Sequence, residues 1–169
     1  MSREFPSQPL VGIGAVVFRE DQVLLVRRAC PPRAGEWSLP GGLQQLGETV
    51  YQAAAREVME ETRIVIRPLA LIDVVDLIEH APSDGRVRWH YTLIDILALW
   101  ESGDPQASDD AAAVQWADAA HLKSLDLWPE TLRIIARARQ LLSDRGAASA
   151  DVSAAHASSG RAGKSHSTF

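Results

Sequence analysis

Apolar runs separated by polar residues in the N-terminal part of the chain predict β-strands. Residues 11–18 and 23–26 are apolar runs rich in β-branched side chains. The four polar residues between them, Arg-Glu-Asp-Gln, predict a hairpin that pairs the two runs. Residues 30–36 are rich in proline and glycine and indicate a loop. Residues 37–39 form a short strand that ends at the Pro-Gly-Gly of residues 40–42.

Two longer segments in the middle of the chain also predict strands. Residues 64–79 are extended, with Pro68 marking an edge or a break between two strands. Residues 87–100 form the longest candidate strand. Residues 93–99 within it are apolar on both faces apart from Asp95, which predicts a place in the middle of the sheet with both faces covered.

Residues 49–62 have the pattern of an amphipathic helix with its own cap. Thr49 and Gln52 form a predicted capping box, in which the threonine side chain accepts from a backbone N–H and the glutamine reaches back. At about 100° per residue, the arc that we expect to pack carries Tyr51, Ala54, Ala55, Val58, Met59 and Thr62. Glu57, Glu60 and Glu61 share the other arc, where their charges repel one another unless a cation binds.

The C-terminal part of the chain predicts one more strand, a helix and a tail. Residues 113–116 form a short strand, and a helix is expected from Pro129 to about Leu142, since proline is tolerated in the first turn. The sequence that follows is rich in alanine, serine and glycine and has few large apolar side chains to bury. We therefore expect one domain over residues 1–145 and a disordered tail over residues 146–169.

Composition and charge narrow the class of protein. A chain of 169 residues with 46% apolar and 23% charged residues is typical of one soluble globular domain. The formal net charge of −5 argues against nucleic acid as a partner, whereas a small phosphorylated ligand is compatible if metal ions screen it. Cys30 is the only cysteine, which suits a reducing cytoplasm. No signal sequence or membrane-spanning apolar run is visible, so we expect a cytoplasmic protein without a membrane partner.

One motif joins a glycine-bearing loop to the acidic face of the predicted helix. The pattern G-x5-E-x7-R-E-U-x-E-E, in which U is apolar, is met at Gly42, Glu48, Arg56, Glu57, Val58, Glu60 and Glu61. A solvated acidic face is the ordinary alternative for the three helical glutamates alone. It does not account for the matches at Gly42, Glu48 and Arg56. The motif resembles the Nudix box, the signature of hydrolases that cleave nucleoside diphosphates linked to another group.

This resemblance implies a fold and a cofactor. Residues 10–142 resemble small bacterial members of the family, MutT-like or ADP-ribose pyrophosphatase-like, so we expect an α/β/α sandwich with a mixed central β-sheet. The expected cofactor is Mg²⁺, with Mn²⁺ as an alternative, because carboxylate oxygens are the natural ligands of hard cations.

The resemblance also implies a role for each matched residue. The implied metal ligands are Glu57, Glu61, Glu60 (in the alternative, the general base), Glu48 in support, and the carbonyl of Gly42. Arg56 would hold the glutamates by charge-assisted hydrogen bonds, beside the plainer interpretation of an i,i+4 pair with Glu60. Asp109 and Asp110 are the candidates for an acidic ligand from outside the helix, with a solvated loop pair as the alternative.

One position departs from the family pattern. Arg63 stands where the box has glycine before its last apolar residue. We expect a left-handed helix cap there, in which a residue other than glycine costs about 1 kcal/mol or more. The implied metal ligands are unaffected, so altered local geometry is expected rather than lost catalysis.

Arginine and aromatic side chains outside the motif are candidates for binding the substrate. Arg27, Arg28 and Arg33 are candidates for a phosphate or ribose contact, with plain surface charge as the alternative. Trp89 and Tyr91 are candidates for stacking on a base, although core packing is favoured for Trp89.

The implied reaction is hydrolysis of a nucleoside diphosphate linked to another moiety by metal-activated water, with ADP-ribose or a nucleotide sugar as the expected substrate. One alternative is a MutT-like pyrophosphohydrolase of nucleoside triphosphates, oxidised ones included. Another is a Nudix domain that senses a nucleotide without catalysis, against which the intact Glu57, Glu60 and Glu61 argue. A small-molecule substrate is the expected partner, and the sequence leaves a homodimer open.

Overall fold

The computed structural model describes the backbone of residues 3–31, 33–108 and 111–159, and side chains up to residue 147. The elements in this part of the chain are β1 (Leu10–Arg19), β2 (Gln22–Arg28), β3 (Trp37–Ser38), β4 (Gly41–Leu43), α1 (Val50–Thr62), β5 (Val65–His80), β6 (Val87–Ser102), β7 (Ala111–Ala117), α2 (Ala119–Ser124) and α3 (Pro129–Ser159). The predicted hairpin is confirmed, since β1 and β2 pair in antiparallel fashion next to the turn.

These strands form one mixed sheet. Its main path has the order β3-β2-β1-β6-β5, while β4 pairs with β1 and β7 pairs with β2. β1 and β6 run parallel, and the other paired strands are antiparallel. β6 therefore lies between β1 and β5, in the interior position that its apolar run predicts.

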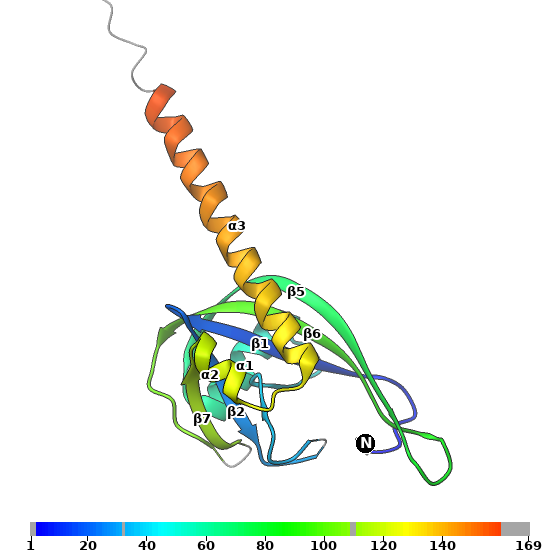
Figure 1. Ribbon diagram of the computed structural model, residues 1–169. Helices are drawn as coiled ribbons and strands as arrows, with labels where there is room; N and C mark the ends of the chain where they lie inside the picture. The colour runs from blue at the N-terminus through cyan, green and yellow to red at the C-terminus, as the bar shows by residue number, and fades with distance from the viewer. Residues whose placement is uncertain (1–2, 32, 109–110, 160–169) are drawn as a thin grey trace, which may run out of the picture.

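Helices cover both faces of this sheet (Figure 1). On one face α1 packs, and the buried cluster there includes Ala53, Ala54, Val58, Ile13, Val17, Leu24 and Ile96. On the other face α3 packs, and the buried cluster there includes Ile134, Ile135, Ala138, Val16, Phe18, Leu25 and Leu97. Neighbouring strand residues such as Val16 and Val17 point to opposite faces, so each strand feeds both clusters. The expected α/β/α sandwich is confirmed.

Two short elements were not expected from the sequence. Gly41–Leu43 forms strand β4, where a glycine-rich loop was predicted, because pairing with β1 outweighs the low strand propensity of glycine. Helix α2 follows Asp118, whose side chain accepts a hydrogen bond from the His121 backbone N–H at 2.8 Å. That aspartate is an N-cap signal readable in the sequence.

Pro68 lies in β5, the edge strand of the sheet, so the predicted edge is confirmed and the alternative of a break between two strands is wrong. β5 is continuous over Val65–His80, and its register against β6 shifts between Pro68 and Ala70. A bulge at this point lets the strand accommodate a residue that has no N–H to donate.

Helix α3 extends well past its predicted end near Leu142 and reaches Ser159, so that it projects from the rest of the fold (Figure 1). Residues 143–147 are exposed, and alanine, the best helix former, is frequent in the segment that follows. The prediction weighed burial alone and missed this propensity. The helical backbone over residues 146–159 differs from the disordered tail that was expected there. Residues 160–169 lie outside the described residues. The domain boundary at residue 145 stays a prediction. No helix in the described part of the chain, this one included, is long and apolar enough to cross a membrane.

Candidate functional site

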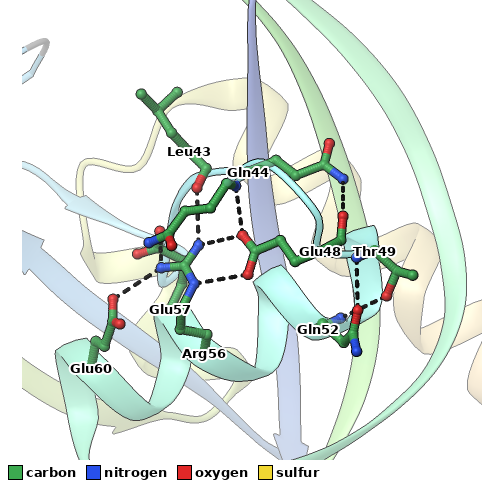
Figure 2. A network of polar contacts seen from close by, with 9 residues as sticks. Leu43, Gln44, Glu48, Thr49, Gln52, Arg56, Glu57 and Glu60 are labelled. Atoms are coloured by element: carbon green, nitrogen blue, oxygen red, sulfur yellow. Dashed lines mark hydrogen bonds and ion pairs between the residues drawn. The ribbon is translucent and has the colours of Figure 1, made fainter.

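Helix α1 begins at the predicted cap. The Gln52 backbone N–H donates to Thr49 Oγ1 at 3.2 Å, and the Thr49 backbone N–H donates to the Gln52 side chain at 2.8 Å. Both halves of the capping box are therefore present (Figure 2). The cap fixes the first turn, and with it the direction in which the glutamates of the later turns leave the helix.

The helix ends at the predicted left-handed residue. Arg63 has φ 63° and ψ 18°, and its N–H donates to the Met59 carbonyl at 3.0 Å. The Thr62 carbonyl accepts from the Gln106 backbone N–H at 2.9 Å, which satisfies one of the last carbonyls of the helix. Arginine thus occupies a conformation that favours glycine.

The packing face of α1 is rotated relative to the prediction. Tyr51 was expected to pack but is 42% exposed, whereas Ala53 is fully buried. The buried positions are Ala53, Ala54, Val58 and Thr62, so the packed arc extends round the helix on the side of Glu57 and Glu61. Of the glutamates, Glu60 is exposed as expected, whereas Glu57 and Glu61 are partly buried beside the packed arc.

The guanidinium of Arg56 ties this acidic face to the preceding loop (Figure 2). Its Nε donates to Glu48 Oε2 at 3.0 Å, and its Nη2 donates to Glu48 Oε1 at 2.6 Å. Its Nη1 donates to Glu57 Oε1 at 2.8 Å and to Glu60 Oε2 at 3.0 Å, while Nη2 also donates to the Leu43 carbonyl at 3.0 Å. The charge-assisted hydrogen bonds expected of Arg56 and the i,i+4 pair with Glu60 are both present.

Glu48 faces Arg56. Its Oε1 also accepts from the Gln45 backbone N–H at 2.6 Å. The hydrogen bonds from Arg56 and then from Gln45 lower the pKa of the Glu48 carboxyl to about 2. Because both oxygens are engaged, the contacts of Glu48 are those of a residue that positions Arg56.

The remaining carboxylates of α1 reach strand β4. The Glu57 carboxylate lies over the Cα of Gly42, where any Cβ would collide with it. The Glu61 Oε2 accepts from the Gly41 backbone N–H at 2.9 Å. A Cβ on Gly41 would collide with the Ile13 carbonyl oxygen. Gly42 therefore allows the close approach of Glu57 on α1 to β4, and Gly41 allows the close approach of β4 to β1.

This arrangement fits a hard divalent cation. The Glu57 side chain is only 13% exposed, and burial raises the pKa of its carboxyl against the opposing effect of Arg56. A cation beside Glu57 would reverse that penalty. Within the described residues, no three His, Cys, Asp or Glu side chains surround one metal position. Mg²⁺ is usually bound through one or two carboxylates together with water and substrate phosphates, so two carboxylates such as those of Glu57 and Glu61 would be enough to hold it.

A cavity of about 500 Å³ opens beside these carboxylates. It brings together most of the predicted site residues: Gly42, Arg56, Glu57, Glu60, Glu61, Arg28, Arg33 and Tyr91. The Arg33 guanidinium carbon lies 4.7 Å from the centre of the Trp128 ring, and its nitrogens lie 3.6 Å from carboxylate oxygens of Glu36 and Glu79. Acidic and basic side chains thus share one cavity wall, as binding of a phosphorylated ligand with a cation requires.

Several predicted residues lie elsewhere. Arg27 is exposed, and its Nε donates to the Gly35 carbonyl at 2.9 Å; alternation along β2 turns it away from the cavity that Arg28 lines. Trp89 is buried and stacks on Tyr91 with ring centres 6.4 Å apart, which confirms core packing. Asp109 and Asp110 lie outside the described residues, and a further acidic ligand from them stays a prediction.

Other residues of the cavity were not singled out from the sequence: Arg3, Asp95, Trp128 and Thr131. The one sequence signal for Asp95 was its place as the only charged residue in the apolar run of β6. No local pattern indicates that the first turn of α3 covers a cavity, because this follows from packing between distant segments.

Comparison with known proteins agrees with this geometry. A family model described as the NUDIX domain matches residues 8–138. The chain belongs to the Nudix family. It is a Nudix hydrolase, and the Nudix hydrolases generally use divalent metal ions.

Three similar proteins illustrate the range of this family. The ADP-ribose pyrophosphatase of Methanocaldococcus jannaschii is 30% identical over 69% of this chain and 66% of its own length, just under two thirds. The protein named "Putative 8-oxo-dGTP diphosphatase 2" of Mycobacterium tuberculosis is 36% identical over 71% of this chain and 80% of its own length. The crystal structure of a MutT Nudix hydrolase from Burkholderia pseudomallei has a TM-score of 0.65 and 32% identity, and the match covers 78% of this chain and 98% of that chain.

Proposed function

We propose that this Nudix hydrolase uses Mg²⁺ to hydrolyse a nucleoside diphosphate linked to another moiety, with ADP-ribose or a nucleotide sugar as the substrate. The observation that carries the proposal is that the carboxylates of α1 line the same cavity as Arg28 and Arg33. Carboxylates provide ligands for the cation, and arginines provide charge and hydrogen bonds for phosphate oxygens. Mn²⁺ is the alternative ion, because it also accepts oxygen ligands.

The proposal assigns a role to each side chain. Glu57 and Glu61 hold the ion, and the carbonyl of Gly42 is a further ligand. Glu60 accepts from Arg56 through Oε2, and its 54% exposed side chain in the cavity wall leaves the carboxylate accessible as another ligand or as the general base that accepts a proton from the attacking water. When bound, the ion lowers the pKa of that water and screens the charge on the phosphate oxygens.

Arg56 acts as a positioning residue. Its hydrogen bonds to Glu57 and Glu60 hold two carboxylates in fixed rotamers, and Glu48 and the Leu43 carbonyl hold Arg56 in turn. Arg28 and Arg33 would contact the substrate phosphates from the other part of the wall. The diphosphate is thereby held in a fixed orientation relative to the base that receives the proton.

The size and lining of the cavity support a diphosphate with groups at both ends. Its volume of about 500 Å³ falls within the range of small-molecule sites. Beyond the carboxylates it continues along Tyr91 and Trp128, so a second part of the substrate has a wall to bind. The M. jannaschii relative, named as an ADP-ribose pyrophosphatase, supports the same class.

A second candidate is a pyrophosphohydrolase of nucleoside triphosphates. It is favoured by the M. tuberculosis relative, which is named for 8-oxo-dGTP and matches this chain over 80% of its own length. The same carboxylates would serve either reaction, because the metal site binds the diphosphate and does not contact the group attached to it.

Product analysis with Mg²⁺ distinguishes the candidates. Hydrolysis of ADP-ribose between its phosphorus atoms gives two phosphorylated organic products, AMP and ribose 5-phosphate. Hydrolysis of a nucleoside triphosphate gives a monophosphate and pyrophosphate. We expect a higher kcat/KM for ADP-ribose or a nucleotide sugar than for any triphosphate. A triphosphate preferred by about tenfold or more, about 1.4 kcal/mol of transition-state binding, would refute the substrate assignment. Nucleotide binding without turnover would instead indicate a sensor.

A further inference from the structure

The cavity extends from α1 across β1 to the face of the sheet that α3 covers. Two glycines of β1, Gly12 and Gly14, line it there. A Cβ on Gly12 would lie 2.7 Å from Leu93 Cδ2, and a Cβ on Gly14 would collide with the Asp95 carboxylate. The Asp95 side chain therefore lies over Gly14. If position 14 held any residue other than glycine, its side chain would fill this space.

Asp95 is a buried residue whose carboxylate has no hydrogen-bond partner in the part of the chain that the structure describes. It is 6% exposed and lines the cavity. Among the described residues, none donates a hydrogen bond to its carboxylate. Thr131 of α3 is 8% exposed and lines the same cavity, and its hydroxyl likewise makes no hydrogen bond to the described residues. The oxygens of these two side chains are open to the cavity rather than sealed in the protein interior, so a ligand that enters the cavity can supply their hydrogen-bond partners.

Nearby charges do not neutralise Asp95. Arg133 is the positively charged side chain that attracts the Asp95 carboxylate. Its guanidinium already donates to Asp73 at 2.9 Å and to Glu130 at 2.6 Å. Burial, followed by the charge of Asp73, raises the pKa of Asp95 to about 6, with Arg133 opposing and Glu130 adding to the effect. At pH 8 the side chain is therefore an ionised group that can only accept hydrogen bonds.

The position of Asp95 relative to the metal-binding carboxylates is set by the sheet. Gly14 pairs with Gly41 of β4 on one side and with Asp95 of β6 on the other. Two strand spacings, about 10 Å, thus separate the Gly41 backbone, which holds Glu61, from that of Asp95. This separation leaves room for a sugar between a diphosphate at α1 and a base at Asp95.

Apolar side chains flank Asp95 in the cavity. Leu93 stands two residues away on the same face of β6, Val75 pairs with Leu93 from β5, and Ile134 follows Thr131 by one helical turn. Apolar walls with a few convergent polar groups suit the faces and the polar edge of a nucleobase better than the hydroxyl-rich surface of a sugar.

We infer that Asp95, together with Thr131, binds the nucleobase of the substrate, with the Asp95 carboxylate accepting a hydrogen bond from an exocyclic amino group. The inference rests on the proposed function and deepens it, because it selects bases that carry an amino group. A site built to pair with an N–H group discriminates strongly against an analogue that lacks it.

The test compares matched substrates at pH 8 with Mg²⁺. One pair is ADP-ribose and its analogue with purine in place of adenine, and the other is 8-oxo-dGTP and its analogue without the 2-amino group. For the pair that is turned over, we expect kcat/KM to favour the amino-bearing base by about tenfold or more. Asp95→Ala should bring this ratio close to one, mainly through KM, and Asp95→Asn, which keeps an acceptor oxygen, should give an intermediate ratio. Asp76→Asn, on the exposed side of β5, is the control and should keep the wild-type ratio.

Binding of the monophosphates provides a second measurement that needs no turnover. Calorimetry without divalent metal should show tighter binding of AMP or GMP than of its analogue without the amino group, and Asp95→Ala should abolish the difference. A wild-type ratio near one, or a ratio unchanged in Asp95→Ala, would overturn the inference. Intact discrimination in binding without hydrolysis of any substrate would contradict the proposed function and leave the role of Asp95 standing.

Discussion

The Glu57 carboxylate lies against the Cα of Gly42 so closely that no Cβ fits between them. This contact joins helix α1 to strand β4 and places the carboxylate at the cavity wall. Asp95 and Gly14 repeat the same relationship on the α3 face of the sheet. In both places, a missing side chain on one strand makes room for a carboxylate that faces the cavity.

Gly42→Ala tests the first of these contacts. The added methyl group would displace the Glu57 carboxylate, and a shift of about 1 Å in a catalytic group can lower the rate by about a hundredfold. We expect kcat to fall by that order while circular dichroism shows a retained fold. Gly146→Ala is the control, because a Cβ there meets no neighbouring atom and the helix should gain slightly in stability. Equal kcat for Gly42→Ala and wild type would show that the Glu57 position is not critical.

Arg56→Lys tests whether the arginine positions the glutamates. Lysine keeps the charge but cannot make the two parallel hydrogen bonds to Glu48 while also reaching Glu57 and Glu60. We expect kcat with saturating Mg²⁺ to fall by about tenfold or more. Arg67→Lys changes an exposed pair with Glu101 and should leave kcat unchanged. If Arg56→Lys behaves in the same way, Arg56 is only a surface partner of Glu60.

Arg63→Gly tests the strain at the end of α1. Glycine adopts a φ near 63° without the steric penalty that arginine incurs, so the free energy of unfolding should rise by up to about 1 kcal/mol. Arg63→Ala keeps the penalty and should show no such gain. Thermal unfolding measures both variants, and a lower melting temperature for Arg63→Gly would mean that the arginine side chain makes a compensating contact.

Asp95→Asn tests the energetic penalty of the buried carboxyl. The pKa of Asp95 is about 6 in the folded protein, above its ordinary value of 3.8. The folded state therefore holds a proton that the unfolded state has released between these values, so stability falls as the pH rises from about 4 to 6 and stays lowered above that. A shift of about two pKa units corresponds to about 3 kcal/mol. Asp95→Asn should be more stable than wild type at pH 8, by up to that amount, and similar at pH 4. Equal stability at both values would show that the carboxyl is not desolvated.

Much of the site could be predicted because its signals are local. The capping pair Thr49 and Gln52 and the spacing of the glutamates follow from residues within a few turns of one helix. The left-handed conformation of Arg63 was expected from the resemblance, because the family pattern has glycine there. The strands of the first hairpin and the interior position of β6 follow from apolar runs and turn residues in the same way. Propensity alone would also have extended α3, whose alanine-rich continuation needs no packing partner.

The rest of the site depends on contacts between distant segments. Arg27 and Arg28 are neighbours in the sequence, and only the pairing of β2 decides which of them lines the cavity. Asp95, Gly14 and Thr131 are brought together by the register of β1 and β6 and by the docking of α3, none of which has a local pattern. The residues proposed to bind the base could therefore be identified only from the three-dimensional structure.

Metal dependence of Glu57→Gln and Glu61→Gln tests the central claim most directly. Both changes keep the size and the hydrogen-bonding capacity of the side chain but remove its charge, so each should lower kcat with Mg²⁺ by about a hundredfold or more. Circular dichroism should show a retained fold, and Glu101→Gln, at an exposed position near the end of β6, should keep wild-type turnover. Titration of Mg²⁺ against hydrolysis of the preferred substrate is the measurement. Near-wild-type turnover in both variants would contradict a catalytic metal site on helix α1.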